Sequence, residues 1–181
     1  LSDTALVLSI VAGVTLAALE RAAPGRPVVR AMPNTGTLVG HGAAAIAPGI
    51  DAGELDLALA ERILGAVGIV VRVPEDHLDA VTGLSGSGPA YVFLVAEAMI
   101  DAGVRVGLPR DVSDALVRQT LLGAARLLES GDDGPEAHRA AVTSPGGTTE
   151  AGLEVLEARG VRAAMIEAIE AATRRSHELG R

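Results

Sequence analysis

The residues best suited to chemistry lie in one short stretch, Ser-Pro-Gly-Gly-Thr-Thr, which runs from Ser144 to Thr149. Proline followed by glycine suits the two central positions of a type II turn, and the serine before the proline is pushed towards an extended conformation. A helix that begins at about Thr148 leaves its first backbone N–H groups unpaired, and its dipole favours an anion there. The stretch therefore predicts a cradle for a small carboxylate or phosphate. A tight turn with a hydroxyl helix cap is the plainer interpretation of this motif taken alone.

Two strand ends form a second candidate site. In doubly wound sheets, ligands bind beyond the carboxyl ends of the strands. The ends of the first two predicted strands would therefore line one crevice with Ala12, Gly13, Met32, Pro33 and Asn34. Ala12 and Gly13 are small enough to admit a flat ring. Asn34 offers an amide for orienting a ligand, although an asparagine after a strand is more often a turn residue.

Other polar or glycine-rich positions favour structural roles. The glycines of residues 83–91 follow no predicted strand and lack the Lys-Ser/Thr ending of a phosphate loop, so they indicate close backbone approach at a helix entry. Glu97 interrupts an apolar helix, which predicts a buried hydrogen bond or an arginine partner. Ser144 has no identifiable histidine base. The four histidines lack partners at metal-ligand spacing and are interpreted as non-catalytic, with no metal site: His41, His77, His138 and His177.

Strand and helix patterns alternate in the first part of the chain and give way to helices alone after about residue 75. Four apolar segments of strand length are predicted at residues 5–12, 26–33, 42–49 and 69–75, with helices at about 15–23 and 51–67. The 51–67 helix carries Leu55, Leu59, Ile63 and Val67 at four-residue spacing. Helices then follow at about 76–82, 88–106, 110–130, 135–142, 148–159 and 161–179. The pattern predicts an α/β domain over residues 1–75, with a largely parallel sheet, and an all-α domain over residues 76–181.

One predicted helix, residues 88–106, is apolar almost all round. A helix tolerates this only when it is enclosed on every side. A helical domain this small cannot enclose it alone, so we expect a second subunit to bury it.

Composition excludes several classes of protein and partner. The 181 residues carry a formal net charge of −8 and scattered arginines, which argues against a nucleic-acid surface. The absence of cysteine removes disulfides and fits a cytoplasmic protein. No apolar run is long enough to span a bilayer, so no membrane partner is expected. The chain starts without methionine, directly in a strand-like segment, which favours a fragment of a longer gene product.

Taken together, the motifs resemble those of the pyrroline-5-carboxylate reductases. The segments AGVT, RAMPNT, VTGLSGSGPAY, GLPR, VTSPGGTTEAGL and RAAMIEAI occur in that family's order and spacing, from about Leu8 onward. The family usually has proline where Gly36 stands here, and we expect the glycine to loosen that loop. The resemblance also implies that the first strand and the glycine-rich phosphate loop of a typical member are missing, which would leave sheet edges unpaired and weaken cofactor binding.

The resemblance implies an incomplete Rossmann-type NAD(P)-binding domain followed by an interlocking dimerisation domain. It further implies hydride transfer from NADPH or NADH to the imine of 1-pyrroline-5-carboxylate, which gives L-proline in a homodimer or larger homo-oligomer. The implied substrate-binding residues are Ser144, Gly146, Gly147, Thr148 and Thr149, with the Thr149 hydroxyl as the catalytic contact to the ring nitrogen. The implied cofactor-binding residues are Ala12, Gly13, Met32, Pro33 and Asn34, with Val142 and Thr143 supplied across the dimer.

Two alternatives stay open. The first is a non-catalytic oligomerisation fragment of such an enzyme, although a module of that kind has no need of an anion cradle. The second is a hydroxyacid dehydrogenase of related architecture. That class would require a lysine as general acid in the helical domain, and this chain contains no lysine.

Overall fold

A computed structural model describes residues 5–180 of the chain. The elements follow one another as β1 (Val7–Ser9), α1 (Leu16–Ala22), β2 (Val28–Pro33), the 3-10 turn η1 (Thr35–Val39), β3 (Gly42–Pro48), α2 (Glu54–Gly65), β4 (Gly68–Arg72), the 3-10 turn η2 (Glu75–His77), α3 (Leu78–Val81), the π-turn η3 (Thr82–Gly86), α4 (Gly88–Arg105), α5 (Arg110–Glu129), α6 (Pro135–Ala141), α7 (Thr148–Ala158) and α8 (Val161–Leu179). Every helix and strand that the sequence predicts is present, and the strands are shorter than predicted at one or both ends. The α/β part followed by helices is therefore confirmed.

The four strands form one sheet in the order β1-β2-β3-β4. The β1–β2 and β3–β4 pairs are parallel, as predicted, whereas β2 and β3 run antiparallel with Ala31 opposite Ile46. The antiparallel pair departs from the sequence prediction because the connection from Asn34 to His41 holds only a 3-10 turn. A parallel return would need a crossover of a dozen or more residues.

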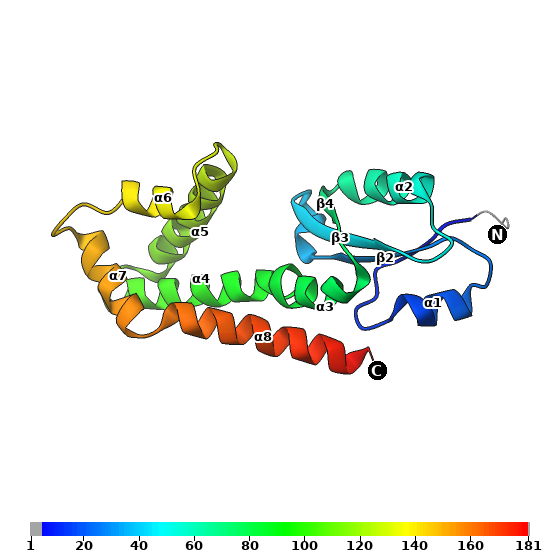
Figure 1. Ribbon diagram of the computed structural model, residues 1–181. Coiled ribbons are helices and arrows are strands. Elements are labelled where there is room, and N and C mark those ends of the chain that lie inside the picture. Colours follow the sequence, from blue (N-terminus) through cyan, green and yellow to red (C-terminus); the bar gives the residue numbers. More distant parts are fainter. Residues whose placement is uncertain (1–4, 181) are drawn as a thin grey trace. The chain divides into compact units, whose positions relative to one another are not determined.

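Helices cover both faces of this sheet, with α2 on one side and α1 and α3 on the other (Figure 1). Alternating strand residues divide between the two layers, as the two-residue period of a strand requires. Val29 and Ile46 pack in the α2 layer, whereas Val28 and Ala45 pack in the layer of α1 and α3. Leu78 of α3 is fully buried there. The core of this part of the chain is therefore a three-layer sandwich of small and branched aliphatic side chains.

Helix α2 turns a different face to the sheet from the one the sequence indicated. The buried residues are Leu57, Ala60 and Leu64, whereas Leu55 is 88% exposed and Ile63 is 49% exposed. Residues spaced strictly by four drift around a helix of 3.6 residues per turn. The i, i+3, i+7 spacing of the buried residues stays on one face, so that stripe is the one that packs.

The described chain divides into two compact units. One contains residues 5–90 with 166–180, and the other contains Tyr91–Met165. The functional division near residue 75 stays a prediction. No helix within residues 5–180 is long and apolar enough to cross a membrane.

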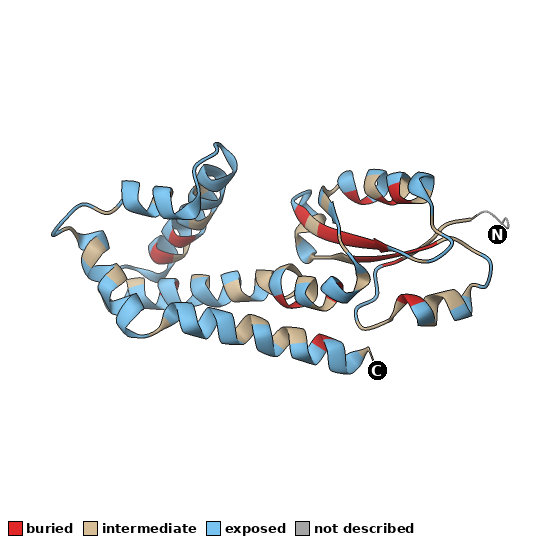
Figure 2. Ribbon diagram, in the orientation of Figure 1, coloured by how far each residue is buried: buried red, intermediate tan, exposed pale blue. Residues whose placement is uncertain are grey.

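The unit Tyr91–Met165 buries few of its own residues. Its buried side chains are Ile100, Ser113 and Val117, of which Ser113 donates a hydrogen bond from Oγ to the Ile100 carbonyl oxygen (2.8 Å). Large apolar side chains stay exposed, including Phe93 (62%) and Leu94 (65%) on α4. Figure 2 shows this contrast: buried residues gather on the strands, and the helices of this unit are almost entirely exposed.

Candidate active site

The turn from Ser144 to Gly147 has the geometry that the sequence predicts. Gly146 has a φ of +69°, the left-handed conformation that the third residue of a type II turn needs. The Gly147 N–H donates to the Ser144 carbonyl oxygen at 3.0 Å, which closes the turn. Helix α7 then begins at Thr148, as predicted, with Gly147 as its N-cap. Since glycine has no side chain, the hydroxyl cap of the plainer interpretation is absent.

A carboxylate already sits on this turn. The Glu150 Oε2 accepts a hydrogen bond from the Gly146 N–H at 2.6 Å. Glu150 did not stand out in the sequence, although a glutamate at the third helical position is a recognised helix-start signal. Because the Gly147 N–H closes the turn, the free donors at the start of α7 are the N–H groups of Thr148, Thr149 and Glu150, which have no partner one turn earlier in the helix.

Ser144 folds closely over the turn. A Cβ added at Gly147 would collide with the Ser144 Oγ and would lie 2.9 Å from its carbonyl oxygen. The second glycine of the motif is therefore required by this close approach, whereas the first is required by its positive φ. The Ser144 hydroxyl lies beside the first helical turn as a result.

The predicted catalytic residue, Thr149, lines an apolar hollow of about 340 Å³ between α5, α6 and α7. Val142 and Leu153 line the same hollow, and so does His138, whose Nε2 is buried without a hydrogen-bond partner among the described residues. Thr143 differs from its neighbour Val142, because its hydroxyl donates to the Arg139 carbonyl oxygen at 2.6 Å and so ends α6. The hollow thus offers a mainly apolar wall to which Thr149 contributes.

The residues predicted to line the crevice at the strand ends share one edge of the sheet. Since β1 and β2 are parallel, with Ser9 opposite Arg30, the residues that follow β1 lie near the end of β2. Ala12 is exposed, and Gly13 has a φ of +77°. Met32 is half-buried and packs its Cε against Gly86, where an added Cβ would lie 2.7 Å away. This edge therefore brings Ala12, Gly13, Met32, Pro33 and Asn34 together.

Asn34 holds the loop that follows β2. Its Oδ1 accepts from the N–H groups of Gly36 and Ala43, each at 3.1 Å, and its Nδ2 donates to the Ser85 carbonyl oxygen at 3.0 Å. Both acceptor positions of the amide are therefore in use. Gly36 is held rather than loosened, because its N–H makes one of these bonds and an added Cβ would lie 2.5 Å from the His41 carbonyl oxygen. Proline at that position would have no N–H to donate.

The glycine-rich segment before α4 serves close packing, as predicted. A Cβ at Gly83 would collide with the Thr173 Oγ1 and lie 2.8 Å from the Ile169 carbonyl oxygen, so α8 approaches the π-turn directly. Nearby, Asp79 accepts a hydrogen bond from the Ser176 hydroxyl at 2.6 Å and lies 3.2 Å from the His177 Nδ1. A serine nucleophile needs a hydrogen bond to the imidazole that acts as its base. Ser176 contacts the carboxylate instead, so these three residues do not form a catalytic triad.

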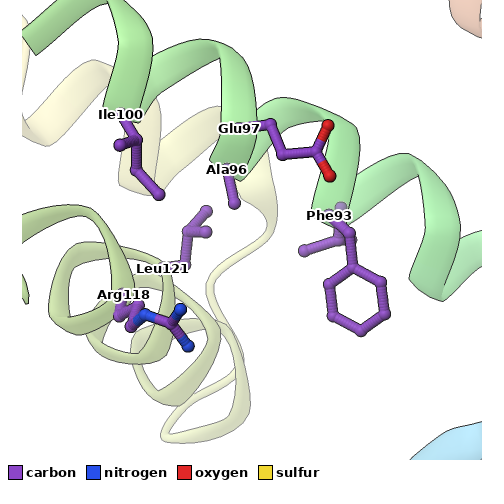
Figure 3. A pocket seen from close by; sticks show the side chains of 7 residues that line it. Phe93, Ala96, Glu97, Ile100, Arg118 and Leu121 are labelled. Carbon is purple, nitrogen blue, oxygen red and sulfur yellow. The ribbon is translucent and has the colours of Figure 1, made fainter. Parts of the chain in front are cut away.

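Glu97 is exposed in the single chain, so its buried hydrogen bond or arginine partner stays a prediction for the assembled protein. It lines a hollow of about 380 Å³ between α4 and α5. Figure 3 shows Phe93 and Ile100 of α4 on one side of the hollow and Leu121 of α5 on the other. Arg118 at its rim pairs with Asp114 at 2.7 Å, and that hydrogen bond holds the pKa of the Asp114 carboxyl below its ordinary value.

Residues 5–180 contain no cluster of His, Asp and Glu able to hold a metal ion.

Comparison with known proteins places the chain in one family. The family model for pyrroline-5-carboxylate reductase dimerisation matches residues 75–179. The pyrroline-5-carboxylate reductase of Synechocystis is 52% identical over 176 residues, which cover 97% of this chain and 66% of the relative. The chain thus spans slightly less than two thirds of that relative's length.

The chain is also similar to solved structures of proteins from this family. The structure of a pyrroline-5-carboxylate reductase from Coxiella burnetii has a TM-score of 0.93 and 40% identity, with 97% of this chain and 66% of that chain covered. A Plasmodium falciparum pyrroline carboxylate reductase, crystallised with NADP bound, has a TM-score of 0.89 and 34% identity, with coverages of 97% and 71%.

Proposed function

The chain belongs to the pyrroline-5-carboxylate reductase family, and from that membership we propose that it carries the substrate turn and dimerising helices of a reductase. The proposed reaction is NAD(P)H-dependent reduction of the imine of 1-pyrroline-5-carboxylate to L-proline, an oxidoreductase reaction on a CH–NH group in proline biosynthesis. The observation that carries the proposal is the built turn at Ser144–Gly147, where helix α7 starts beside an apolar hollow.

The turn binds the substrate carboxylate in this proposal. The Ser144 hydroxyl and the N–H groups of Thr148 and Thr149 are the donors, because the Gly147 N–H is already engaged with Ser144. Gly147, which the family resemblance places among the substrate-binding residues, therefore closes the turn in this proposal and does not donate to the carboxylate. Gly146 supports the turn through its left-handed conformation rather than through its N–H, which Glu150 occupies.

Thr149 places a hydroxyl against the ring nitrogen of the substrate. Thr149 lines the apolar hollow, where the methylene carbons of a five-membered ring can pack. A protonated imine is already electrophilic, so the protein's main task is to align the ring and exclude water. Thr149 does this by fixing the nitrogen, and it holds the proton on that atom through a hydrogen bond.

The sheet edge fits a nicotinamide ring. Ala12 is exposed, and Met32 and Pro33 present an apolar wall, so a flat ring can lie against the strand ends. Gly13 instead admits the end of α8, because an added Cβ there would lie 3.3 Å from the Leu179 Cβ. When bound, NADPH or NADH supplies the hydride that reduces the C=N bond. Asn34 contributes by holding the loop, because its amide oxygen is fully used within the fold. Val142 and Thr143 would flank the cofactor across the dimer.

A second copy of the chain would cover the exposed apolar side chains of α4 and α5. Phe93 and Leu94 are both more than half exposed in the single chain, and an apolar surface of this kind marks an interaction site. The same observation favours the alternative function, a non-catalytic oligomerisation module. A cytoplasmic location and the functional boundary at residue 75 belong to the proposal as well.

The deciding experiment measures substrate-dependent oxidation of NADPH by the full reading frame that encodes this chain, with a no-substrate reaction as control. The reductase proposal requires oxidation that depends on pyrroline-5-carboxylate and is weakened by Ser144→Ala. If the protein is dimeric by light scattering but oxidises no NADPH, the reductase proposal fails and the alternative, a non-catalytic oligomerisation module, takes its place.

A further inference from the structure

Arg30 places a charge inside the sheet. Its side chain is 7% exposed, and it lies in the interior strand β2 between Ser9 of β1 and Ala47 of β3. Strand alternation puts it on the same face as Val28, which packs with α1 and α3. A guanidinium taken out of water needs a hydrogen-bonded counter-charge, since an unpaired buried charge is strongly destabilising.

Glu75 supplies that counter-charge and makes a second contact. Its Oε1 lies 3.0 Å from the Arg30 Nη1, and the same oxygen accepts a hydrogen bond from the Leu16 backbone N–H at 2.6 Å. Leu16 is the first residue of α1, so its N–H has no partner within the helix. One carboxylate oxygen therefore joins β2 to the start of α1, across 45 and 59 residues of sequence.

Glu75 is itself well anchored. Two residues before it, the Val73 N–H donates to the Ile46 carbonyl oxygen of β3 at 3.0 Å, and three residues after it Leu78 is fully buried. Arg30 is fixed by the strand pairing on both sides. The bridge thus runs between rigid elements and can hold a loop in place.

The loop it holds connects β1 to α1. Ser9 anchors the near end of this loop through its pairing with Arg30, and Leu16 anchors the far end through Glu75. Between them, Val11 and Ala12 are exposed and Gly13 adopts a left-handed conformation. These are the residues placed against the nicotinamide, and Met32 and Pro33 of the opposite wall follow Arg30 on its own strand.

We propose that Glu75 is a positioning residue for the nicotinamide crevice, because its carboxylate sets the β1–α1 loop against the end of β2. It touches neither cofactor nor substrate in this role and acts through the Leu16 N–H. The role rests on the proposed reductase function. Geometry of this kind matters because hydride transfer requires close alignment, and a misplacement of about 1 Å can cost roughly a hundredfold in rate.

The test separates positioning from stability with a double variant, Arg30→Met with Glu75→Leu, in the full reading frame. Replacing a buried ion pair by apolar side chains of similar volume is often neutral for stability, whereas Glu75→Leu alone strands the arginine. The matched control is Arg72→Met with Glu61→Leu. That control removes the exposed pair between β4 and α2, whose atoms lie 2.6 Å apart, together with the contact of Arg72 to Glu54 at 2.7 Å, all on residues outside the crevice.

We expect the double variant to unfold near the wild-type temperature but to lose about tenfold or more in kcat/KM for NADPH. The KM for pyrroline-5-carboxylate should stay within about twofold, since the substrate turn is unaltered. The control pair should leave both constants unchanged. A double variant that has both the stability and the kcat/KM of the wild type would show that Glu75 has only a structural role.

Hydrogen exchange provides a readout that does not need activity. The Leu16 amide should exchange faster in the double variant than in the wild type, while the control pair leaves it protected. An unchanged Leu16 exchange rate would refute the tether. If the wild type itself fails to oxidise NADPH with substrate present, the reductase proposal fails, and the exchange rates still decide whether Glu75 fixes this loop.

Discussion

Glu150 should weaken binding of the carboxylate substrate. Its side chain accepts from the Gly146 N–H at 2.6 Å, on the turn proposed to hold the substrate carboxylate. A second carboxylate on the neighbouring N–H groups would lie close to it, and like charges repel. We therefore predict that Glu150→Gln, which keeps the shape and an acceptor oxygen but removes the charge, lowers the KM for pyrroline-5-carboxylate.

The size of the effect follows from the separation and the exposure. Two unit charges about 4 Å apart repel by about 1 kcal/mol in water and about 4 kcal/mol at an effective dielectric constant of about 20. Gly146 is exposed and Glu150 is half-buried, so the lower part of this range applies. A repulsion of about 1–2 kcal/mol corresponds to roughly a 5- to 30-fold lower KM in the variant.

Steady-state kinetics at saturating NADPH measure this directly. The matched control is Glu154→Gln, which makes the same charge change about 6 Å further along α7 and should alter KM by less than about twofold. The turnover number should be unchanged in both variants, because neither side chain contacts the reacting atoms. A Glu150→Gln enzyme whose KM equals or exceeds that of the wild type would contradict the shared use of this turn.

Three further outcomes can be checked. Thr149→Val should reduce kcat by about a hundredfold with little change in thermal midpoint, and Thr149→Ser should restore most of it, because the hydroxyl alone makes the contact. Gly83→Ala should cost about 1–3 kcal/mol in urea unfolding through overpacking against α8, whereas Gly88→Ala, where an added Cβ meets nothing within 4 Å, should not destabilise. In an NMR titration the carboxyl of Asp114 should titrate below its ordinary pKa, and Arg118→Gln should raise that pKa; the pair therefore stabilises α5 at neutral pH and ceases to do so as the pH falls through the lowered value.

Helix positions were predictable because their signals are local. The sequence predicts the last helix over residues 161–179, and α8 spans Val161–Leu179 after a left-handed Gly160. Strand direction was not predictable in the same way, since apolar runs are identical for parallel and antiparallel pairing. The β2–β3 reversal depends on Gly40, whose φ of +74° ends the 3-10 turn and sends the chain back.

The functional site shows the same difference between local features, which the sequence predicts, and long-range contacts, which it does not. Gly146 could be placed in a turn from its neighbours alone, because the conformational demand lies within four residues. The partners of Asn34 and Glu75 could not be foreseen, since their hydrogen bonds reach across 51 and 59 residues. Contacts of that range leave no periodic trace in a sequence. The sequence therefore offered Asn34 only as a turn residue or a ligand contact, and Glu75 did not stand out at all.

The contact between α8 and α3 has a consequence for how the chain folds as it is synthesised. The α2 layer of the core, from Val29 to Leu64, is built from one continuous stretch and can form as soon as that stretch is complete. The hydrogen bond from Ser176 to Asp79 joins residues 97 apart and must wait for the last helix to be made. Translation proceeds from the N-terminus, so the surface at Gly83 that packs against α8 stays exposed to water until α8 has been made. A nascent chain halted before α8 should therefore resist proteolysis in its sheet while remaining cleavable at the π-turn.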